Sequence, residues 1–388
     1  MDSVNTTMNH HYHTEAESVK FKDITSSAEN RKVLYRIKNN DPSLIRLSID
    51  ITDDDHDANV SALFQPEEGD DLGWLGYFIG ENKTLESLFI HYLPTCTDQI
   101  GRFFNGLEHN ESIEEVEFFP VVGPPIESFS SIILPHVTTM RVGHNLHDRE
   151  KVRCVAMGLQ RCQSLVNYSG PIAEVIASSL LTLPMLEKVN VWVEDNLPIS
   201  RGECLALRRL LEESTNIRYL HICNAGLGND GLELLAEGLA SNVSLTDGLL
   251  NLSGNAISDQ GLQALASSLA LNSELRTLHL TDNSIGDAGV EALTDSLAHN
   301  TSLRELSLSG NASITEIGMT AMSRVLTTHT SCLEDLRLEG IGIGGLRALA
   351  HALSQNKSLK KLCVGDVGDE GACALAGALV EFEVSPFR

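Results

Sequence analysis

A nine-residue pattern of leucines that ends in asparagine recurs along this chain. Residues 275–283 are LRTLHLTDN, and residues 303–311, which begin 28 positions later, are LRELSLSGN. This pattern is typical of a short strand, a turn and a following helix, which is expected here at 289–298. A single unit cannot bury its own apolar face, so the units must stack to close a core. The repeat therefore predicts an array of strand–turn–helix units and favours binding over catalysis.

The first position of this pattern can be located repeatedly through most of the chain, and its recurrence predicts about twelve units. The repeat is regular over 217–379 and divergent over 44–216, where the spacing between openings varies from 21 to 41 residues. Near residue 245 two extra residues precede the asparagine, and Asp247-Gly248 predicts a turn or bulge. The residues that open the predicted strands are Leu44, Leu85, Ile113, Val137, Leu165, Leu186, Ile217, Leu245, Leu275, Leu303, Leu333 and Leu359.

The remaining segments do not carry the repeat. Residues 1–25 are polar and aperiodic, which predicts a disordered tail, and residues 26–43 predict an N-terminal capping helix. Residues 51–70 hold a run of Asp and Glu, which predicts an acidic surface loop inserted into the solenoid of residues 44–379. Residues 380–388 are expected to form a C-terminal tail. We expect the two ends to cover the open edges of the sheet.

Charge and cysteine content limit the classes of partner and site. The 388 residues carry a net charge of −25, which disfavours nucleic acid and anionic membranes and favours a basic partner. The eight cysteines have neither the pairing of a disulfide framework nor the spacing of a zinc site. The N-terminus lacks a secretory signal, and no run of about 18 apolar residues is present. We therefore expect a monomer in the cytoplasm, with a nuclear location left open.

The turn after the strand extends the pattern. Residues 283–289 (NSIGDAG) complete a unit of the form LxxLxLxxNxIxxxG. Units of about 28 residues with this pattern resemble the leucine-rich repeats of the ribonuclease-inhibitor class, strongly over 217–379 and weakly over 44–186. The resemblance implies an α/β solenoid shaped as a horseshoe, with a parallel β-sheet on the concave face and helices on the convex face. It implies no chemistry, because the class includes enzyme inhibitors, immune receptors, actin regulators and Ran GTPase activators.

Asparagine occurs at two positions of the repeat, and each predicts a structural role. At the ninth position its amide is expected to bond to backbone groups of neighbouring units where the chain leaves the strand. A second asparagine, three residues before several strand openings, forms Asn-x-Ser/Thr sequons. We expect it to end the preceding helix in the left-handed conformation rather than to carry a glycan. The ninth-position asparagines are Asn145, Asn255, Asn283 and Asn311, and the sequon asparagines are Asn82, Asn110, Asn242, Asn300 and Asn356.

Two motifs match known ligand-binding patterns only in part. Residues 340–345 satisfy the dinucleotide pattern GxGxxG, but the repeat accounts for these glycines, and Lys360 and Lys361 stand where an acidic residue is needed. Residues 53–57 alternate aspartates like a calcium loop, but Ala58 occupies the required glycine position. No spacing indicates a nucleophile, a P-loop or a paired acid and base. The sequence thus predicts no catalytic residues, cofactor or metal site.

The strand positions that face away from the core form the candidate binding surface. Side chains alternate across a sheet, so positions three, five and seven of each unit are expected to point to the concave wall. Aromatic side chains there are typical of protein-binding hot spots, and adjacent glutamates favour a basic partner. A register shift of one residue would instead place Phe89, Phe119 and Trp192 in the core. The predicted partner-binding residues are Phe89, His91, Glu115, Glu117, Phe119, Arg141, Lys188, Trp192, Tyr219 and His221.

The sequence therefore predicts a non-catalytic scaffold that binds another protein on its concave face, mainly through the divergent half. The wall of the regular half, over 277–339, is expected to be less distinctive. The alternative is a regulator of an enzyme, either an inhibitor resembling ribonuclease inhibitor or a GTPase-activating protein resembling Ran GTPase activators. Ribonuclease inhibitor is rich in Cys and Trp, whereas this chain has eight and two. Ran GTPase activators end in a long acidic tail, whereas the acid of this chain lies near its other end.

Overall fold

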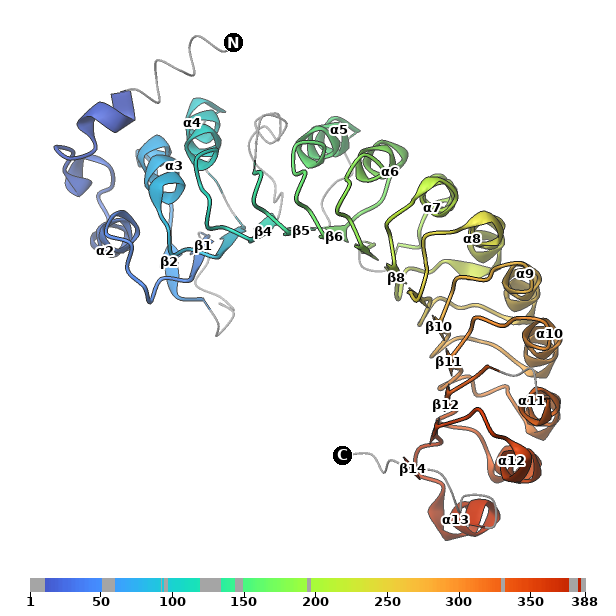
Figure 1. Cartoon of the computed structure of the whole chain (residues 1–388). Coiled ribbons are helices and arrows are strands. Elements are labelled where there is room, and N and C mark those ends of the chain that lie inside the picture. The colour runs from blue at the N-terminus through green and yellow to red at the C-terminus, as the bar shows by residue number, and fades with distance from the viewer. Residues whose placement is uncertain are drawn as a thin grey trace. The chain divides into compact units, whose positions relative to one another are not determined.

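A computed structural model of the chain shows short strands that alternate with helices (Figure 1). The chain divides into unit 1, which holds Met1–Pro171 and Ser178–Leu186, and unit 2, which holds Ile172–Ala177 and Glu187–Arg388. The boundary falls within α6 (Glu174–Leu180). The residues that the structure describes are 11–50, 60–91, 93, 97–118, 134–143, 149–193, 197–328, 332–376 and 383–384.

Unit 1 contains a parallel sheet whose described strands follow the order β2-β1-β3-β4-β5-β6. Alternate strand residues are buried, as Leu88 and Ile90 of β3 illustrate. The elements of unit 1 are η1 (Phe21–Asp23), α2 (Ala28–Lys38), β1 (Arg46–Ile49), β2 (Ala62–Phe64), α3 (Leu72–Glu81), β3 (Ser87–Ile90), α4 (Thr97–Leu107), β4 (Glu115–Phe118), β5 (Thr139–Val142), α5 (Arg149–Leu159) and β6 (Asn167–Gly170).

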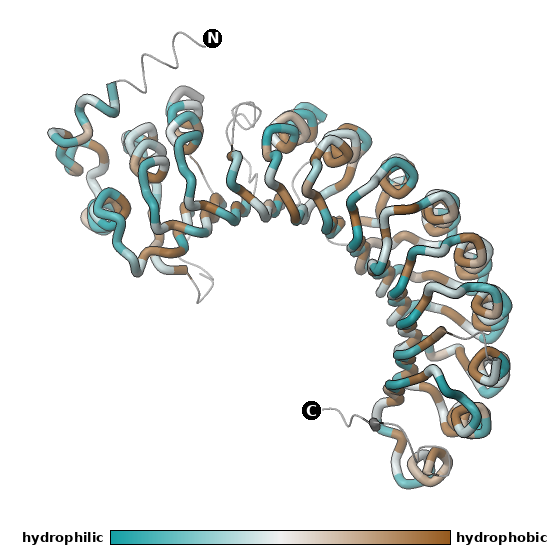
Figure 2. The backbone as a smooth tube through the Cα atoms, viewed as in Figure 1, coloured by the Kyte–Doolittle hydropathy of each residue, from teal (hydrophilic) through white to brown (hydrophobic). Residues whose placement is uncertain are grey.

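Unit 2 contains a parallel sheet whose strands follow one another in chain order from β7 to β14. Leu220, Leu250 and Leu278 lie in register on adjacent strands and are buried. Apolar residues gather on the strands and on one side of the helices, so the core lies between these two layers (Figure 2). The elements of unit 2 are β7 (Lys188–Val191), α7 (Arg201–Glu213), β8 (Tyr219–Ile222), α8 (Gly228–Ser241), β9 (Leu249–Asn251), α9 (Asp259–Leu269), β10 (Thr277–His279), α10 (Asp287–Leu297), β11 (Glu305–Ser307), α11 (Glu316–Thr327), β12 (Asp335–Arg337), α12 (Ile343–Gln355), β13 (Lys361–Cys363), α13 (Gly368–Ala376) and β14 (Glu383–Val384).

The predicted α/β solenoid of about twelve strand–helix units is confirmed. Eleven of the twelve predicted openings lie two residues before the first residue of a strand. The exception is β9, which begins four residues after Leu245 because a turn intervenes. Asp247 has a φ of 55° there, and a Cβ on Gly248 would lie 2.1 Å from the carbonyl oxygen of Arg218. The extra residues therefore form the turn that their sequence predicted.

Structure occurs in two segments that were predicted to be irregular. Residues 11–15 of the expected tail are helical, and Tyr12 is 5% exposed with its ring centroid 4.7 Å from that of Trp74. Gly73 leaves the space for this ring, because a Cβ there would lie 2.0 Å from the Tyr12 hydroxyl oxygen. Within the expected loop 51–70, β2 pairs with β1, whereas residues 51–59 lie outside the described residues. The Tyr12 contact involves one residue and β2 spans only three, so neither produces a periodic sequence pattern from which it could be predicted.

The ninth-position asparagines join neighbouring repeats, as predicted. The side-chain oxygen of Asn283 accepts hydrogen bonds from the backbone N–H groups of Asn255 and Ile257, both at 3.0 Å. Its side-chain nitrogen donates to the carbonyl oxygen of Leu252 at 3.1 Å. Asn255 and Asn311 make equivalent bonds to backbone groups of the repeat before them. Asn145 lies outside the described residues.

The sequon asparagines end helices, but the predicted left-handed conformation is wrong. Asn82 and Asn242 have φ values of −74° and −68°, in the extended region. The Asn242 side-chain nitrogen donates to the carbonyl oxygen of Leu211 at 2.7 Å, and its oxygen accepts from the N–H of Leu245 at 3.0 Å. Bonds in both directions hold the backbone extended. Because Asn82, Asn110, Asn242 and Asn300 are buried, the nitrogen that glycosylation would modify is not accessible in these four sequons.

Candidate interaction surface

The strand residues between the buried positions reach the surface of each sheet. In unit 1, Phe89 and His91 are half-buried while Leu88 and Ile90 are buried. Glu115, Glu117 and Arg141 are likewise half-buried. The sequence left open whether Phe89 lies on the exposed wall or in the core. Its partial exposure places Phe89 on the exposed face of the strands. Phe119 lies outside the described residues.

Arg141 lies at the centre of an ionic cluster in unit 1. Glu117 pairs with Arg141 in register on β5, with 3.3 Å between Oε2 and Nη1, and Glu115 also forms an ion pair with Arg141. On the other side, His91 Nδ1 lies 3.3 Å from Asp50 Oδ2, and His91 Nε2 lies 3.9 Å from Glu117 Oε1. We call these five residues the Arg141 cluster. Because Arg141 serves both glutamates, their attraction for a basic partner is weakened.

Four predicted residues lie on or directly after two neighbouring strands of unit 2. Lys188 is in register with Tyr219, and His221 stands two residues further along β8. Trp192, directly after β7, is half-buried and therefore not a core residue, while Tyr219 is 39% exposed. Burial, together with the charges of Lys188 and His279, lowers the pKa of His221 to about 4. We call Lys188, Trp192, Tyr219 and His221 the Tyr219 patch.

The strand face of the regular repeats carries a row of ion pairs that was not predicted. His279 Nε2 lies 3.1 Å from Glu305 Oε1, and Arg337 Nη2 lies 2.6 Å from the same oxygen. Asp335 lies 3.2 Å from both Arg337 Nη2 and Lys361 Nζ. These residues lie on four successive strands, β10 to β13, at two positions of the repeat. Glu305, Asp335 and Lys361 share one position, and His279 and Arg337 share the position two residues further along. Acidic and basic residues at these two positions of successive repeats were the sequence signal that could have revealed the row.

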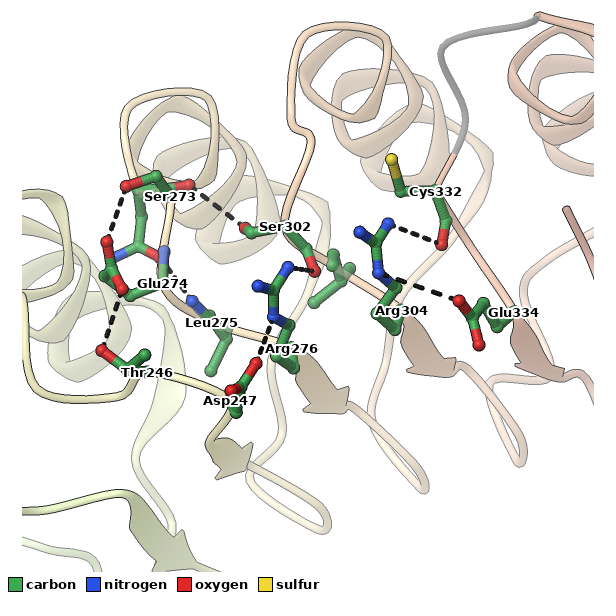
Figure 3. Close-up of polar contacts among 12 residues, drawn as sticks. Thr246, Asp247, Ser273, Glu274, Leu275, Arg276, Ser302, Arg304, Cys332 and Glu334 are labelled. Carbon is green, nitrogen blue, oxygen red and sulfur yellow. Dashed lines mark hydrogen bonds and ion pairs between the residues drawn. The ribbon is translucent and has the colours of Figure 1, made fainter.

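A second set of polar contacts follows the starts of the strands in unit 2 (Figure 3). Arg276 Nε lies 2.7 Å from Asp247 Oδ1, and Arg276 Nη1 donates to the carbonyl oxygen of Ser302 at 2.9 Å. Arg304, one repeat later, donates in the same way to the carbonyl oxygen of Cys332 at 3.1 Å. Each arginine therefore reaches the loop of the following repeat, which identifies these contacts as links between repeats.

No group of three or more His, Cys, Asp or Glu side chains in the described ranges is placed to hold a metal ion. Seven of the cysteines belong to those ranges, and none of the seven is in a disulfide. The glycines of 340–345 form the turn before α12 and its first residues. An open groove of about 690 Å³ lies between α10 and α11, lined by Asp287, Ala288, Glu291, Glu316, Ile317, Thr320, Ala321 and Arg324. None of the helices within the described ranges is both long and apolar enough to cross a membrane.

Comparisons with known proteins agree with the repeat pattern. The family model described as "Leucine Rich repeat" matches residues 249–266, 271–293 and 299–323. Leucine-rich repeat-containing protein 45 of Gallus gallus is 36% identical over 80 residues, which cover 21% of this chain and 12% of that protein. The chain thus spans only a small part of the length of this relative.

Solved structures also align with parts of the chain. The actin-binding site 2 of leiomodin-1 aligns with a TM-score of 0.32 and 19% identity, covering 47% of this chain and 89% of that structure. A Bacteroides fragilis protein aligns with a TM-score of 0.39 and 15% identity, covering 58% and 66%. The tropomodulin C-terminal domain of Caenorhabditis elegans aligns with a TM-score of 0.29 and 15% identity, covering 45% and 89%.

Proposed function

Because this chain is a leucine-rich repeat protein, we propose that it is a non-catalytic scaffold that binds another protein through the exposed faces of its strands. The observation that carries the proposal is the Tyr219 patch, in which a 39% exposed phenol lies beside Lys188 and two residues before His221, while Trp192 follows the end of β7. Tyr and Trp are over-represented among residues that dominate binding energy, because their rings cover a large area and lose little conformational entropy.

The backbone beneath the patch favours binding without rearrangement. Lys188 and Tyr219 belong to strands that pair along four residues, from Lys188 with Tyr219 to Val191 with Ile222. Strand pairing fixes the backbone from which these side chains project, so a partner does not have to order the backbone on binding. Burial lowers the pKa of His221 to about 4, so the ring is neutral at pH 7 and contributes hydrogen bonding rather than charge.

Unit 1 offers a second contact surface under the same proposal. Phe89 supplies an aromatic ring, and the Arg141 cluster supplies charged groups of both signs. Three carboxylates in this cluster face one arginine and one histidine, so a partner with basic residues is favoured there. The pairing within the cluster makes this attraction weaker than two unpaired glutamates would.

Affinity purification of the full chain followed by mass spectrometry tests the proposal. We expect the double variant Trp192→Ala/Tyr219→Ala to lose partners that the unmodified chain retains. Tyr35→Ala is the matched control, because Tyr35 is 63% exposed on α2 and belongs to neither strand face. If the double variant, Phe89→Ala and Arg141→Ala all recover the same proteins as Tyr35→Ala, the strand faces are not the binding surface.

A further inference from the structure

Some of the cationic side chains on the strand face of unit 2 form an ion pair with a carboxylate, and others do not. Arg337 and Lys361 lie 2.6 Å from Glu305 and 3.2 Å from Asp335 respectively. In the part of the chain that the structure describes, no carboxylate oxygen lies within 4.0 Å of the charged nitrogens of Lys188 or Arg218. The row of ion pairs therefore does not extend to β7 and β8, where these two cations lie.

The irregular repeat explains the state of Arg218. Backbone hydrogen bonds place Arg218, Gly248, Arg276 and Arg304 at the same position of successive repeats. Arg276 contacts Asp247 of the repeat before it. The row neighbours of Arg218 are Glu187 in the repeat before it and Gly248, which has no side chain, in the repeat after it. Gly248 cannot be replaced without strain, because a Cβ there would lie 2.1 Å from the carbonyl oxygen of Arg218. The turn that interrupts the repeat thus leaves Arg218 without an acidic neighbour on that side.

The neighbours of Lys188 also leave its charge uncompensated. Lys188 is in register with Tyr219, and the next residue in that row is Leu249, so neither neighbour is acidic. Glu187 is adjacent in sequence but does not come within 4.0 Å of Lys188 or Arg218. His221 is neutral at pH 7, because burial lowers its pKa to about 4. Among the described residues, two cations, Lys188 and Arg218, and one anion, Glu187, are therefore the charged neighbours of the exposed Tyr219 ring, which gives a local positive charge on a chain of net charge −25.

We propose that the Tyr219 patch, together with Arg218 and Leu249, binds an acidic segment of a partner protein in which a carboxylate adjoins an aromatic or aliphatic side chain. The apolar side chain packs against Tyr219 and Leu249, which are in register on β8 and β9, while the carboxylate contacts Lys188 and Arg218. Charge complementarity selects this occupant, because a basic segment would bring a third cation to two that already lack partners. This inference rests on the proposed function and names the chemistry of the partner at that surface.

Selection from a random peptide display library against the immobilised full chain tests the inference. It is carried out at about 0.15 M salt, where charges further apart than about 8 Å are largely screened, so that the overall negative charge does not mask the patch. We expect the enriched peptides to combine Asp or Glu with an aromatic or aliphatic residue. We also expect Tyr219→Ala to abolish their enrichment.

The charge of the patch is tested with a synthetic peptide of the enriched sequence. Lys188→Glu/Arg218→Glu should weaken its binding about tenfold or more, because two attractive contacts become repulsive. Arg201→Glu/Lys357→Glu is the matched control, because it makes the same charge change at exposed positions on α7 and before β13 and should leave binding within about twofold. Circular dichroism melting of each variant verifies that it is folded.

The outcomes separate this inference from the proposed function. Two outcomes would overturn the inference that the partner segment is acidic but leave the binding surface in place. In the first, the enriched peptides need Tyr219 but lack acidic residues. In the second, the peptide binds the Lys188→Glu/Arg218→Glu variant with the same affinity as it binds the control variant. Peptides that bind equally well to Tyr219→Ala, or a library without any enriched peptide, would count against both. The reversed variant is also expected to enrich basic peptides, and failure to do so would argue against charge as the selector.

Discussion

Unit 1 draws two of its helices together over glycines, whereas unit 2 links successive repeats through a row of asparagines. In unit 1, a Cβ on Gly76 of α3 would lie 2.1 Å from the carbonyl oxygen of Phe103 on α4. In unit 2, Asn255, Asn283 and Asn311 bond to the backbone of neighbouring repeats. The sequon asparagines make buried amide bonds in both units, as Asn110 donates to the carbonyl oxygen of Ile79 in unit 1, so the difference lies at the ninth position of the repeat. A divergent repeat need not keep its asparagine if its helices approach closely.

The strand faces differ in a similar way. In unit 1 both Glu115 and Glu117 depend on Arg141, so the charges form a cluster around one cation. In unit 2 Asp335 has two cationic partners, Arg337 and Lys361, and Arg337 is shared with Glu305. Regular repeats can share charges along a row because equivalent positions recur on every strand. The consequence is that loss of one cation should affect the two faces unequally.

The largest effect is expected from Gly76→Ala, which tests the close contact between α3 and α4. The added methyl group would overlap backbone atoms of Phe103 that cannot rotate away, so we expect the free energy of unfolding to fall by about 3 kcal/mol. Gly202→Ala on α7 is the control, because the nearest atom to a Cβ there is 3.8 Å away. This control should raise stability by about 0.5–1 kcal/mol. Urea unfolding followed by circular dichroism measures both, and equal effects would refute close packing as a feature of unit 1.

The next largest effect is expected from Asn283→Ala in unit 2. The variant leaves the buried N–H groups of Asn255 and Ile257 and the carbonyl oxygen of Leu252 without their amide partner, which should cost about 2 kcal/mol. Asn251→Ala is the control, because the Asn251 side chain bonds only with Ser253 among the contacts described. We expect a loss below about 1 kcal/mol for it. The same urea experiment applies, and a loss for Asn283→Ala no greater than for Asn251→Ala would contradict the role of the asparagine row.

The arginines of the two strand faces provide a smaller and more specific test. Arg141→Met leaves two neighbouring half-buried glutamates without their shared cation, and we expect a loss of about 1 kcal/mol. Arg337→Met should cost about half as much, because Asp335 keeps Lys361 as a cationic partner. Unfolding at low and high salt measures the electrostatic part of each loss. If Arg337→Met proves the more damaging, the shared row does not buffer the loss of a cation.

The repeat pattern predicts the strands well because leucine spacing itself specifies which residues face the core. Thus β10 and β11 follow Leu275 and Leu303 at the same distance, and Phe89 reaches the exposed face as the alternation requires. Contacts between repeats are harder to predict, since the pairing of Arg337 with Glu305 depends on the register of strands about 30 residues apart. The packing of Tyr12 against Trp74 depends on the space that Gly73 leaves, and none of these three residues alone predicts the contact from the sequence.

The smallest effect concerns the titration of His221, which distinguishes the Tyr219 patch from the row of ion pairs. Burial is the main cause that lowers the pKa of His221 to about 4, and Lys188 adds to it. Because the unfolded state binds a proton more readily than the folded state, stability from this group is present above about pH 6.5 and declines as pH falls towards 4. Lys188→Met should therefore raise the pKa of His221 by a fraction of a unit without restoring its ordinary value. NMR titration of the His221 ring measures this shift, with Lys357→Met as a control that should leave it unchanged. An unaltered pKa in Lys188→Met would mean that the lysine charge does not reach the ring, and the patch would then lose the local positive field that favours an acidic partner.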